Sequence, residues 1–481
     1  MSLLKENTKM ASIILCLYMI PIFLSGSFYR DDNGRVISQY YDWDLDGRPL
    51  ANFIIKFLNF GERLTDIAPF SQILAIIIAS LTCAVIATYI IKTNKLIHIL
   101  SISFLFISPF FIQNLSYRFD IVTMCLAIFF AVVPFIFQET KKMIYLLIIS
   151  FISVLSLLMT YQAALPLFYG LIFLDFFINR QTKNNSKKNI INLASGTIAL
   201  AFYYLIIAPH FVGGGYAGDR AKAVSLGSGN FITDIISNII NLINHLSSLI
   251  NLNFLIYFSI IIIGAFLFLL KIIKEEISNK KNLFLLFVFF SAYIVSILIF
   301  FSLKNPVYEP RVMIGFNALF MILAILSLNI TYNRNNIRYI GLLSVILPTL
   351  YFFSIATNYS NASRSYIKYE RDILQSIYND YNNLNISGEI YLDGYSKPPY
   401  IAEQILYNNP FLRNILGGRI GSLTEYLIKS EYPLLNGKVS FNSPPNYIVC
   451  EDVIKKHNGI YTIIKQENKN MVYFQDIHCN N

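Results

Sequence analysis

The sequence predicts an α-helical polytopic membrane protein that ends in a small α/β domain. Of its 481 residues, 55% are hydrophobic and 14% are charged, and the mean hydropathy is +0.53. A soluble chain carries about a quarter charged residues, so this one has too little polar surface to cover a globule in water. The apolar residues also fall in runs of about 20, the length of helix that crosses a bilayer. A soluble helical repeat protein is disfavoured because runs such as 252–270 have almost no polar face.

About eleven spanning helices are expected from these runs. The first run resembles a signal peptide, but no small-residue cleavage site follows it, so we interpret it as a retained span. The predicted spans are 10–28, 69–91, 96–113, 119–138, 143–160, 163–179, 190–208, 252–270, 283–303, 312–330 and 339–356.

The charge distribution predicts how these helices are oriented. Residues 357–481 contain 12 Lys/Arg and 12 Asp/Glu, so the whole formal charge of +10 belongs to residues 1–356. If the N-terminus is cytoplasmic, alternating the spans places a basic cluster in every cytoplasmic connection, as the positive-inside rule requires. We therefore expect a multi-pass membrane protein with a cytoplasmic N-terminus, no nucleic-acid partner and an extracytoplasmic C-terminal domain. The basic clusters lie at 92–95, 141–142, 180–188, 271–281 and 334–338.

Two domains are predicted: a membrane domain over 1–356, with its first outer loop at 29–68, and a C-terminal domain over 357–481. Segment 231–250 is amphipathic at helical spacing, so we expect it to lie in the outer interface of the membrane. Cys450 and Cys479 both lie in the tail, where a disulfide is plausible but not required. The tail is expected to form helices at 366–381 and 399–407, strands at 389–393 and 447–450, and a hairpin from 460–465 and 471–474.

The most informative segment is the start of the first outer loop. Residues 29–50 contain five Asp, three Arg and the only Trp of the protein, Trp43. Asp31 and Asp32 follow the first span closely, where a carboxylate is partly desolvated and is suited to accept a proton. Nearby arginines offer bidentate donors for a phosphate at headgroup level. The alternative is a solvated loop with a turn at Asp46 and Trp43 as a membrane anchor.

Other polar residues on the same predicted side could join this loop. Arg118 and Asp120 begin the fourth span, and Tyr161 and Gln162 lie between two spans. For each of these singly, a helix-end cap or a snorkelling charge is the favoured interpretation. Arg311 is the strongest candidate, because it enters an apolar span on the outer side, against the positive-inside trend. No metal-ligand spacing of Cys or His, no P-loop and no G-x-G-x-x-G motif occurs in the chain.

The sequence resembles the serotype-converting O-antigen glucosyltransferases of the Gtr type II family, which are GT-C-type membrane enzymes. The resemblance extends over the whole chain in layout, although its specific motif covers only about twenty residues. It rests on Asp31-Asp32-Asn33-Gly34-Arg35, on Trp43 and Gly47-Arg48-Pro49-Leu50, and on Thr160-Tyr161-Gln162-Ala163 between two spans. It implies transfer of a hexose, glucose by family inference, from undecaprenyl-phosphate to a lipid-linked O-antigen or another surface glycan, on the outer side of the bacterial inner membrane. A flippase and a synthase for the donor are candidate partners, together with membrane lipid.

The resemblance also implies roles for individual residues. Asp31 or Asp32 would be the base toward the acceptor hydroxyl, and Arg35 and Arg48 would steady the acids or the departing phosphate. Arg311 is a further phosphate candidate, and Tyr161 and Gln162 are candidate substrate-binding residues. From their chemistry alone, Asp42, Asp44 and Asp46 could hold sugar hydroxyls. No cofactor is assigned, because the acids could hold a divalent cation but arginine can equally meet the phosphate charge.

The expected mechanism is an inverting single displacement without a covalent sugar–enzyme intermediate. Two alternatives remain. An O-antigen polymerase or ligase is disfavoured by the acid-rich loop after the first span, since those enzymes usually place Arg-rich motifs in later loops. A flippase or transporter of a lipid-linked sugar would have polar residues at mid-span and internal repeats, whereas here the mid-span positions are nearly all apolar.

Overall fold

The chain forms two compact units in a computed structural model. The membrane unit comprises Met1–Phe23, Tyr41–Glu62 and Ile67–Ala356, and the tail unit comprises Leu24–Tyr40, Arg63–Asp66 and Thr357–Asn481. The first outer loop, which sequence reasoning placed wholly with the membrane domain, is therefore divided between the units. The structure describes residues 2–26, 28–140, 142–212, 218, 231–249, 251–276, 279–331, 338–384, 389–393, 397–416, 422–432, 439–440, 453–457, 459–466 and 469–474.

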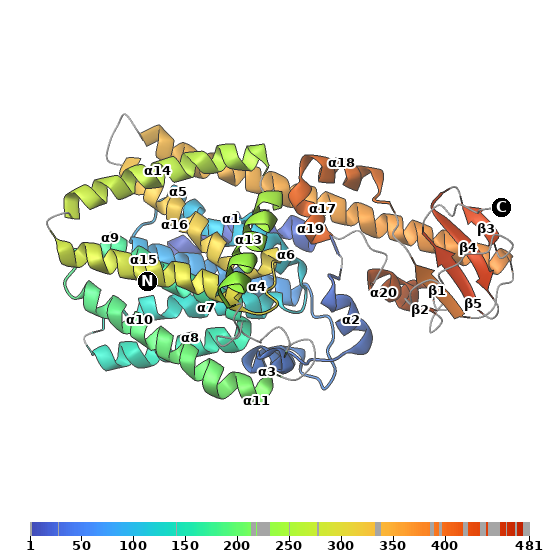
Figure 1. The fold of residues 1–481 in the computed structure, drawn as a ribbon, viewed down its shortest axis with the longest axis horizontal. Coiled ribbons are helices and arrows are strands. Elements are labelled where there is room, and N and C mark those ends of the chain that lie inside the picture. The colour runs from blue at the N-terminus through green and yellow to red at the C-terminus, as the bar shows by residue number, and fades with distance from the viewer. Residues whose placement is uncertain are drawn as a thin grey trace. The chain divides into compact units, whose positions relative to one another are not determined.

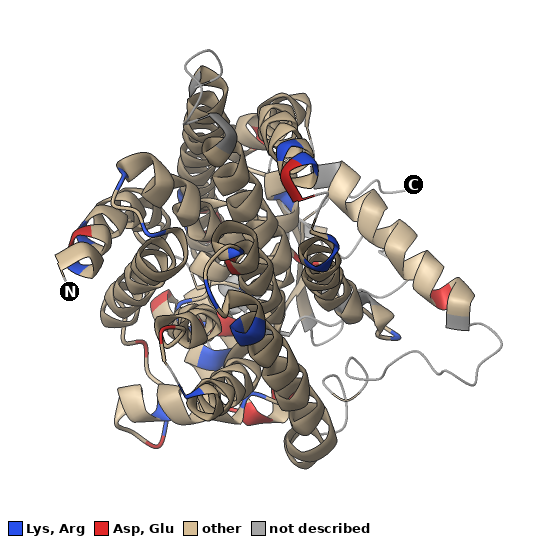
Figure 2. Ribbon diagram, turned by 90° about the vertical axis from the view of Figure 1, so that its left-hand side faces the viewer, with Lys and Arg blue, Asp and Glu red and all other residues tan. Residues whose placement is uncertain are grey.

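The membrane unit is built from apolar helices that run in a largely shared direction (Figure 1). Seen from one end in Figure 2, most of each helix carries neither Lys, Arg, Asp nor Glu, and the charged residues gather at helix ends and connections. This distribution is expected where hydrocarbon surrounds the helix bodies. The main helices are α1 (Ser2–Phe23), α4 (Phe70–Val85), α5 (Leu96–Ile107), α7 (Ile121–Ile136), α8 (Met143–Tyr161), α9 (Leu165–Asn179), α10 (Asn185–Phe202), α14 (Leu252–Glu276), α15 (Lys280–Leu298), α16 (Ile314–Thr331) and the first part of α17 (Arg338–Asn383).

Fewer helices qualify as spans than the sequence predicts. In the described part of the chain, six helices are long and apolar enough to cross a membrane, or seven if α5 and the bent segment Pro109–Ser116 count as one. Two further apolar helices, Ile121–Ile136 and Ile314–Asn329, are shorter than that criterion requires. Run 143–179, predicted as two spans, passes the criterion as a single stretch, although an extended Tyr161 and a 3-10 turn at Gln162–Ala164 divide it into α8 and α9. Hydropathy windows count apolar length, whereas the folded helices are interrupted inside several of these runs.

Short elements of the membrane unit connect the long helices at the polar segments singled out in the sequence. The first loop forms a 3-10 turn, η1 (Asp44–Asp46), and then α3 (Pro49–Asn59), which has Pro at its first position as helices favour. A π-helical stretch, η5 (Tyr203–Ile207), joins α10 to α11 (Ala208–Phe211). The bent segment after α5 consists of η3 (Pro109–Phe111) and α6 (Ile112–Ser116), and η7 (Pro310–Val312) precedes α16.

The tail unit contains a five-stranded sheet with strand order β2-β1-β5-β4-β3. The strands are β1 (Glu389–Asp393), β2 (Val439–Ser440), β3 (Val453–His457), β4 (Tyr461–Gln466) and β5 (Lys469–Tyr473). β1 is parallel to both β2 and β5, whereas β3, β4 and β5 are antiparallel. Strand β1 and the β4–β5 hairpin lie where the alternation in the sequence predicts them. The predicted strand at 447–450, Cys450 and Cys479 lie outside the described residues.

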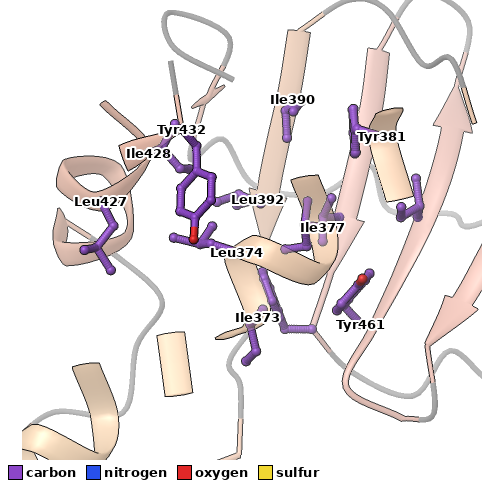
Figure 3. Packing of buried hydrophobic residues seen from close by; sticks show 13 residues of the cluster. Ile373, Leu374, Ile377, Tyr381, Ile390, Leu392, Leu427, Ile428, Tyr432 and Tyr461 are labelled. Carbon is purple, nitrogen blue, oxygen red and sulfur yellow. The ribbon is translucent and has the colours of Figure 1, made fainter. Parts of the chain in front are cut away.

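The second part of α17 and helix α20 (Ser422–Glu431) supply apolar side chains to one core with this sheet (Figure 3). Leu374 and Ile377 of α17 pack with Leu427 of α20, and all three are about 1% exposed. Spacings of three and four residues place such side chains on one helix face. The remaining residues of this hydrophobic core are Ile373, Tyr381, Ile390, Leu392, Ile428, Tyr432, Tyr461, Ile463, Val472 and Phe474.

Helix α13 (Phe231–Leu249) has three distinct sides. At 3.6 residues per turn, the buried residues Asn238 and Leu242 fall on one side of the helix. Next to that side is a stripe of exposed isoleucines, and beyond it lies an exposed polar stripe. Figure 1 shows α13 running across the direction of α14, α15 and α16. A helix with one side on protein, one apolar and one polar fits the predicted position in the membrane interface. The isoleucines are Ile232, Ile236, Ile240 and Ile243, which are 50–69% exposed.

Thiol labelling in a bilayer tests this placement of α13. Ser237 and Ile240 are both exposed but lie on the polar and the apolar stripe. We expect Ser237→Cys to react with a water-soluble maleimide at least roughly tenfold faster than Ile240→Cys, because a thiolate does not form readily in hydrocarbon. Peptide mass spectrometry would follow each introduced cysteine apart from the native ones. Equal rates in lipid would contradict the interfacial placement.

Candidate functional site

Arg48 is the centre of a charged cluster in the membrane unit. Its guanidinium lies 3.7 Å from an Asp120 carboxylate oxygen and 3.9 Å from one of Asp46. It also lies over the ring of Tyr161, 5.3 Å from the centroid, in cation–π geometry. Both ionic distances are longer than hydrogen bonds, and the buried Nε has no hydrogen-bond partner among the described residues. Arg48 is therefore held in place while part of its donor capacity remains available.

Asp120 and Trp43 form a buried pair within this cluster. Trp43 Nε1 donates a hydrogen bond to Asp120 Oδ1, and the tryptophan is only 1% exposed. The alternative interpretation of Trp43 as a membrane anchor is therefore wrong, because its ring is buried within the protein. Asp120 precedes α7 but makes no side-chain cap bond there, so the favoured interpretation of it as a cap is also wrong. Its carboxylate binds the indole because burial requires a partner for each polar group.

The turn that carries Asp46 and Arg48 is fastened to two other elements. The Trp43 carbonyl accepts bonds from the amides of Asp46 and Arg48 at 3.2 and 3.0 Å, which closes the turn. Tyr203 Oη donates to the Gly47 carbonyl at 2.6 Å, and Gln162 Nε2 donates to the same carbonyl at 3.2 Å. Gly47 has φ 76°, and a Cβ there would lie 2.6 Å from Tyr203 Oη. Only glycine therefore fits this position.

A second arginine adjoins the cluster through Tyr161. Tyr161 Oη donates to the Arg311 carbonyl at 2.9 Å, and Asn114 Nδ2 donates to it at 3.1 Å. The Arg311 guanidinium donates to Tyr117 Oη and lies 5.2 Å from the centroid of that ring. Gln113 bridges this loop, since its Oε1 accepts from the Arg311 amide at 2.8 Å and its Nε2 donates to Glu309 at 2.7 Å. Tyr161 thus contacts both arginine residues, the guanidinium of Arg48 through its ring and the backbone carbonyl of Arg311 through its hydroxyl.

The acids predicted to be catalytic belong to the tail unit. Asp31 and Asp32 begin α2 (Asp31–Ser38), where the helix N-terminus stabilises negative charge. Asp31 is exposed, whereas Asp32 is fully buried. Arg35 lies one turn later on the same helix face. Its guanidinium contacts Tyr40, with a bond to the carbonyl at 3.5 Å and the ring centroid at 4.8 Å.

The predicted residues therefore form two groups. Arg48, Asp46, Tyr161, Gln162 and Arg311 join in the membrane unit, with Asp44 in the same turn. Asp31, Asp32 and Arg35 join on α2 in the tail unit.

Sequence reasoning missed the participation of Gln113, Tyr117 and Tyr203. The polar run Gln113-Asn114 at the end of an apolar segment was a usable signal. Tyr203 lies within an apolar run and gave none. Among the described residues, no group of three or more His, Cys, Asp and Glu could hold a metal ion.

Apolar helices with arginines, acids and tyrosines clustered at their ends define a helical membrane protein with a charged cluster where its helices end. The family model described as glucosyl transferase GtrII matches residues 20–322. A Salmonella phage P22 protein, described as an uncharacterized 55.3 kDa protein in the gtrB 5' region, is 30% identical over 415 residues, 83% of this chain and 84% of its own. The chain therefore belongs to the GtrII glucosyl transferase family. No solved structure matches it.

Proposed function

We propose that this protein transfers glucose from undecaprenyl-phosphate to a lipid-linked O-antigen or a related surface glycan on the outer side of the inner membrane. Membership of the GtrII family supports a glycosyltransferase, and the apolar helices support a lipid-linked substrate. The arrangement of charged groups supports a phosphate-linked donor in particular. A phosphodiester at headgroup depth needs permanent cations close to the membrane surface.

The observation that carries the proposal is the state of Arg48. Its ionic contacts at 3.7 and 3.9 Å are loose, and its buried Nε has no partner among the described residues. A donor phosphate would offer the short, bidentate bonds that arginine forms best. Asp46 and Asp120 keep the guanidinium charge compensated while no phosphate is bound, and Tyr161 limits its movement. Arg311, whose backbone carbonyl accepts a hydrogen bond from Tyr161, is the second phosphate ligand in this proposal.

The reaction needs few catalytic groups, since the phosphate is already a good leaving group. Asp31 takes the proton from the acceptor hydroxyl, because it is the exposed acid of the pair on α2. The acceptor oxygen then forms a bond to the anomeric carbon of glucose while the bond from that carbon to the phosphate oxygen breaks. The electron pair of the broken bond leaves with undecaprenyl phosphate, where Arg48 and Arg311 stabilise the charge. Asp44 and Asp46 belong to the turn just before Arg48, and the carboxylates of both would orient the sugar, together with Gln162, which bonds to the Gly47 carbonyl of that turn.

Synthetic donor and acceptor test the function directly. Purified protein in lipid nanodiscs, given undecaprenyl-phosphate-glucose and a lipid-linked O-antigen unit, is expected to release undecaprenyl phosphate and glucosylated acceptor in equal amounts. UDP-glucose is the matched control and should support no transfer. If no polyprenyl-phosphate sugar were used under any condition, the proposed function would be rejected.

The stereochemistry of the product is a separate prediction. One attack from the face opposite the phosphate inverts the anomeric centre, so a β-linked donor should give only the α-linked product. NMR of the product would read the anomeric configuration. Mass spectrometry of protein incubated with donor alone should reveal no glycosylated peptide. A retained anomer, or a trapped glycosyl-enzyme, would contradict single displacement.

A further inference from the structure

The C-terminal domain holds the segment that carries Asp31 and Asp32. Within the tail unit, α2 packs against α20, and the residues just before α2 bind α19 (Arg413–Leu416). Tyr29 Oη donates to the Ile415 carbonyl at 2.7 Å, and the Arg30 guanidinium donates to the Asn414 carbonyl at 3.0 Å. Carbonyls in the last turn of a helix have no partner within it. The tail therefore offers acceptors, and the first loop supplies matching donors.

An apolar contact reinforces these two hydrogen bonds. The ring of Phe28 packs edge-on against Tyr426 of α20, with the centroids 4.8 Å apart and the planes at 69°. Phe28 and Tyr29 are 8% and 7% exposed. Three consecutive residues of the first loop thus contact positions 414–426, almost 400 residues later in the chain. These contacts fix both the position and the direction of the chain segment that leads into α2.

The backbone conformation of Arg30 links these contacts to the orientation of Asp31 and Asp32. Arg30 has φ 44° and ψ −106°, a conformation that a residue with a side chain rarely adopts. Strained residues persist where their surroundings fix them, and here the bond to Asn414 does so. Asn33 Nδ2 also donates to the Arg30 carbonyl at 3.2 Å. Since Asp31 is the next residue, the direction in which α2 begins depends on contacts made by the tail.

We propose that the C-terminal domain positions Asp31 and Asp32 for the transfer reaction, with Phe28, Tyr29 and Arg30 as positioning residues. This inference rests on the proposed function, in which these acids include the base. It assigns a catalytic contribution to a region beyond residues 20–322, the part that matches the family model.

Amide hydrogen exchange combined with kinetics of the full chain tests the inference. Tyr29→Phe removes only the hydroxyl that binds Ile415. We expect exchange across residues 31–38 to become roughly three- to tenfold faster, the effect of losing one hydrogen bond. The kcat should fall by a similar factor while the KM for undecaprenyl-phosphate-glucose stays unchanged. Tyr432→Phe is the control, because it removes a hydroxyl of the same unit that bonds, at 3.4 and 3.5 Å, to groups of α17.

Two results would overturn the inference. One is wild-type exchange at residues 31–38 in Tyr29→Phe, and the other is faster exchange there with unchanged kcat. In an Asp31→Asn background, Tyr29→Phe should still speed exchange but lower turnover no further, since both changes act through one group. If Asp31→Asn and Asp32→Asn both kept wild-type turnover, the base assigned in the proposed function would be rejected. Amide hydrogen exchange at residues 31–38 in the Tyr29→Phe variant would still report independently whether the tail holds α2.

Discussion

Replacing Asp31 with Asn is expected to lower kcat by about 10²- to 10⁴-fold, the usual contribution of a general base. Asparagine has nearly the same shape but cannot accept the proton of the acceptor hydroxyl. The KM for the donor should change little, because Arg48 and Arg311 belong to the membrane unit and are untouched. Initial rates with synthetic donor and acceptor would measure both constants.

Asp32 and an unrelated acid provide the comparison. Asp32 is fully buried at the start of α2, so Asp32→Asn should lower thermal stability as well as turnover, whereas Asp31→Asn should lower turnover alone. Asp372→Asn alters an exposed carboxylate of the same unit and should leave both unchanged. Wild-type kcat in both Asp31→Asn and Asp32→Asn would show that the base lies elsewhere.

Arg48→Gln is expected to reduce kcat/KM for the donor by roughly 10²- to 10³-fold, as for loss of a preorganised group that stabilises transition-state charge. Arg48→Lys keeps the charge but not the planar fork, so we expect an intermediate loss. The change should appear in both KM and kcat, since the phosphate binds Arg48 before and during departure. Initial rates measured as a function of donor concentration, at saturating acceptor, give kcat and KM separately.

The control for Arg48 is an arginine in an ordinary surface ion pair. Arg371 pairs with Glu431 at 2.8 Å, with 51% and 34% of the two side chains exposed. Such pairs contribute little, so Arg371→Gln should leave kcat/KM near the wild-type value. Arg48→Gln also leaves Asp120 with one cation fewer, so the unfolding temperature should be measured alongside. A variant that folds normally and transfers glucose at the wild-type rate would remove Arg48 from the donor site.

Sequence patterns predicted the elements that depend on local composition. The apolar runs gave a helical membrane protein, and the alternation at Glu389–Asp393 marked a strand that the structure contains. The number of spans was less accurate, with about eleven expected and six or seven long enough in the described residues. Part of the difference arises because residues 143–179, expected to be two spans, form one long apolar stretch, and because the helices at Ile121–Ile136 and Ile314–Asn329 are shorter than a full span. Hydropathy alone does not fix where a helix ends.

For the candidate site too, local sequence identified some residues but not the contacts that they make. Motif residues such as Arg48 and Gln162 were identifiable because they stand in polar segments at the ends of apolar runs. The residues that they contact could not be identified from the sequence. Trp43 binds Asp120 across 77 residues of sequence, and Gln162 reaches Gly47 across 115. The result is that Gln162, expected to bind substrate, uses its amide nitrogen to hold the turn that carries Arg48.

By itself, the sequence determined that this is a membrane protein of the GtrII type with a charged first loop, because composition and motif are properties of short stretches of chain. The tertiary structure alone decided that the loop is divided. Arg48 and Trp43 join the membrane unit, whereas Asp31 and Asp32 join the tail. That division depends on which distant groups satisfy the donors and apolar rings of residues 28–48. Such partners become neighbours only when the whole chain packs.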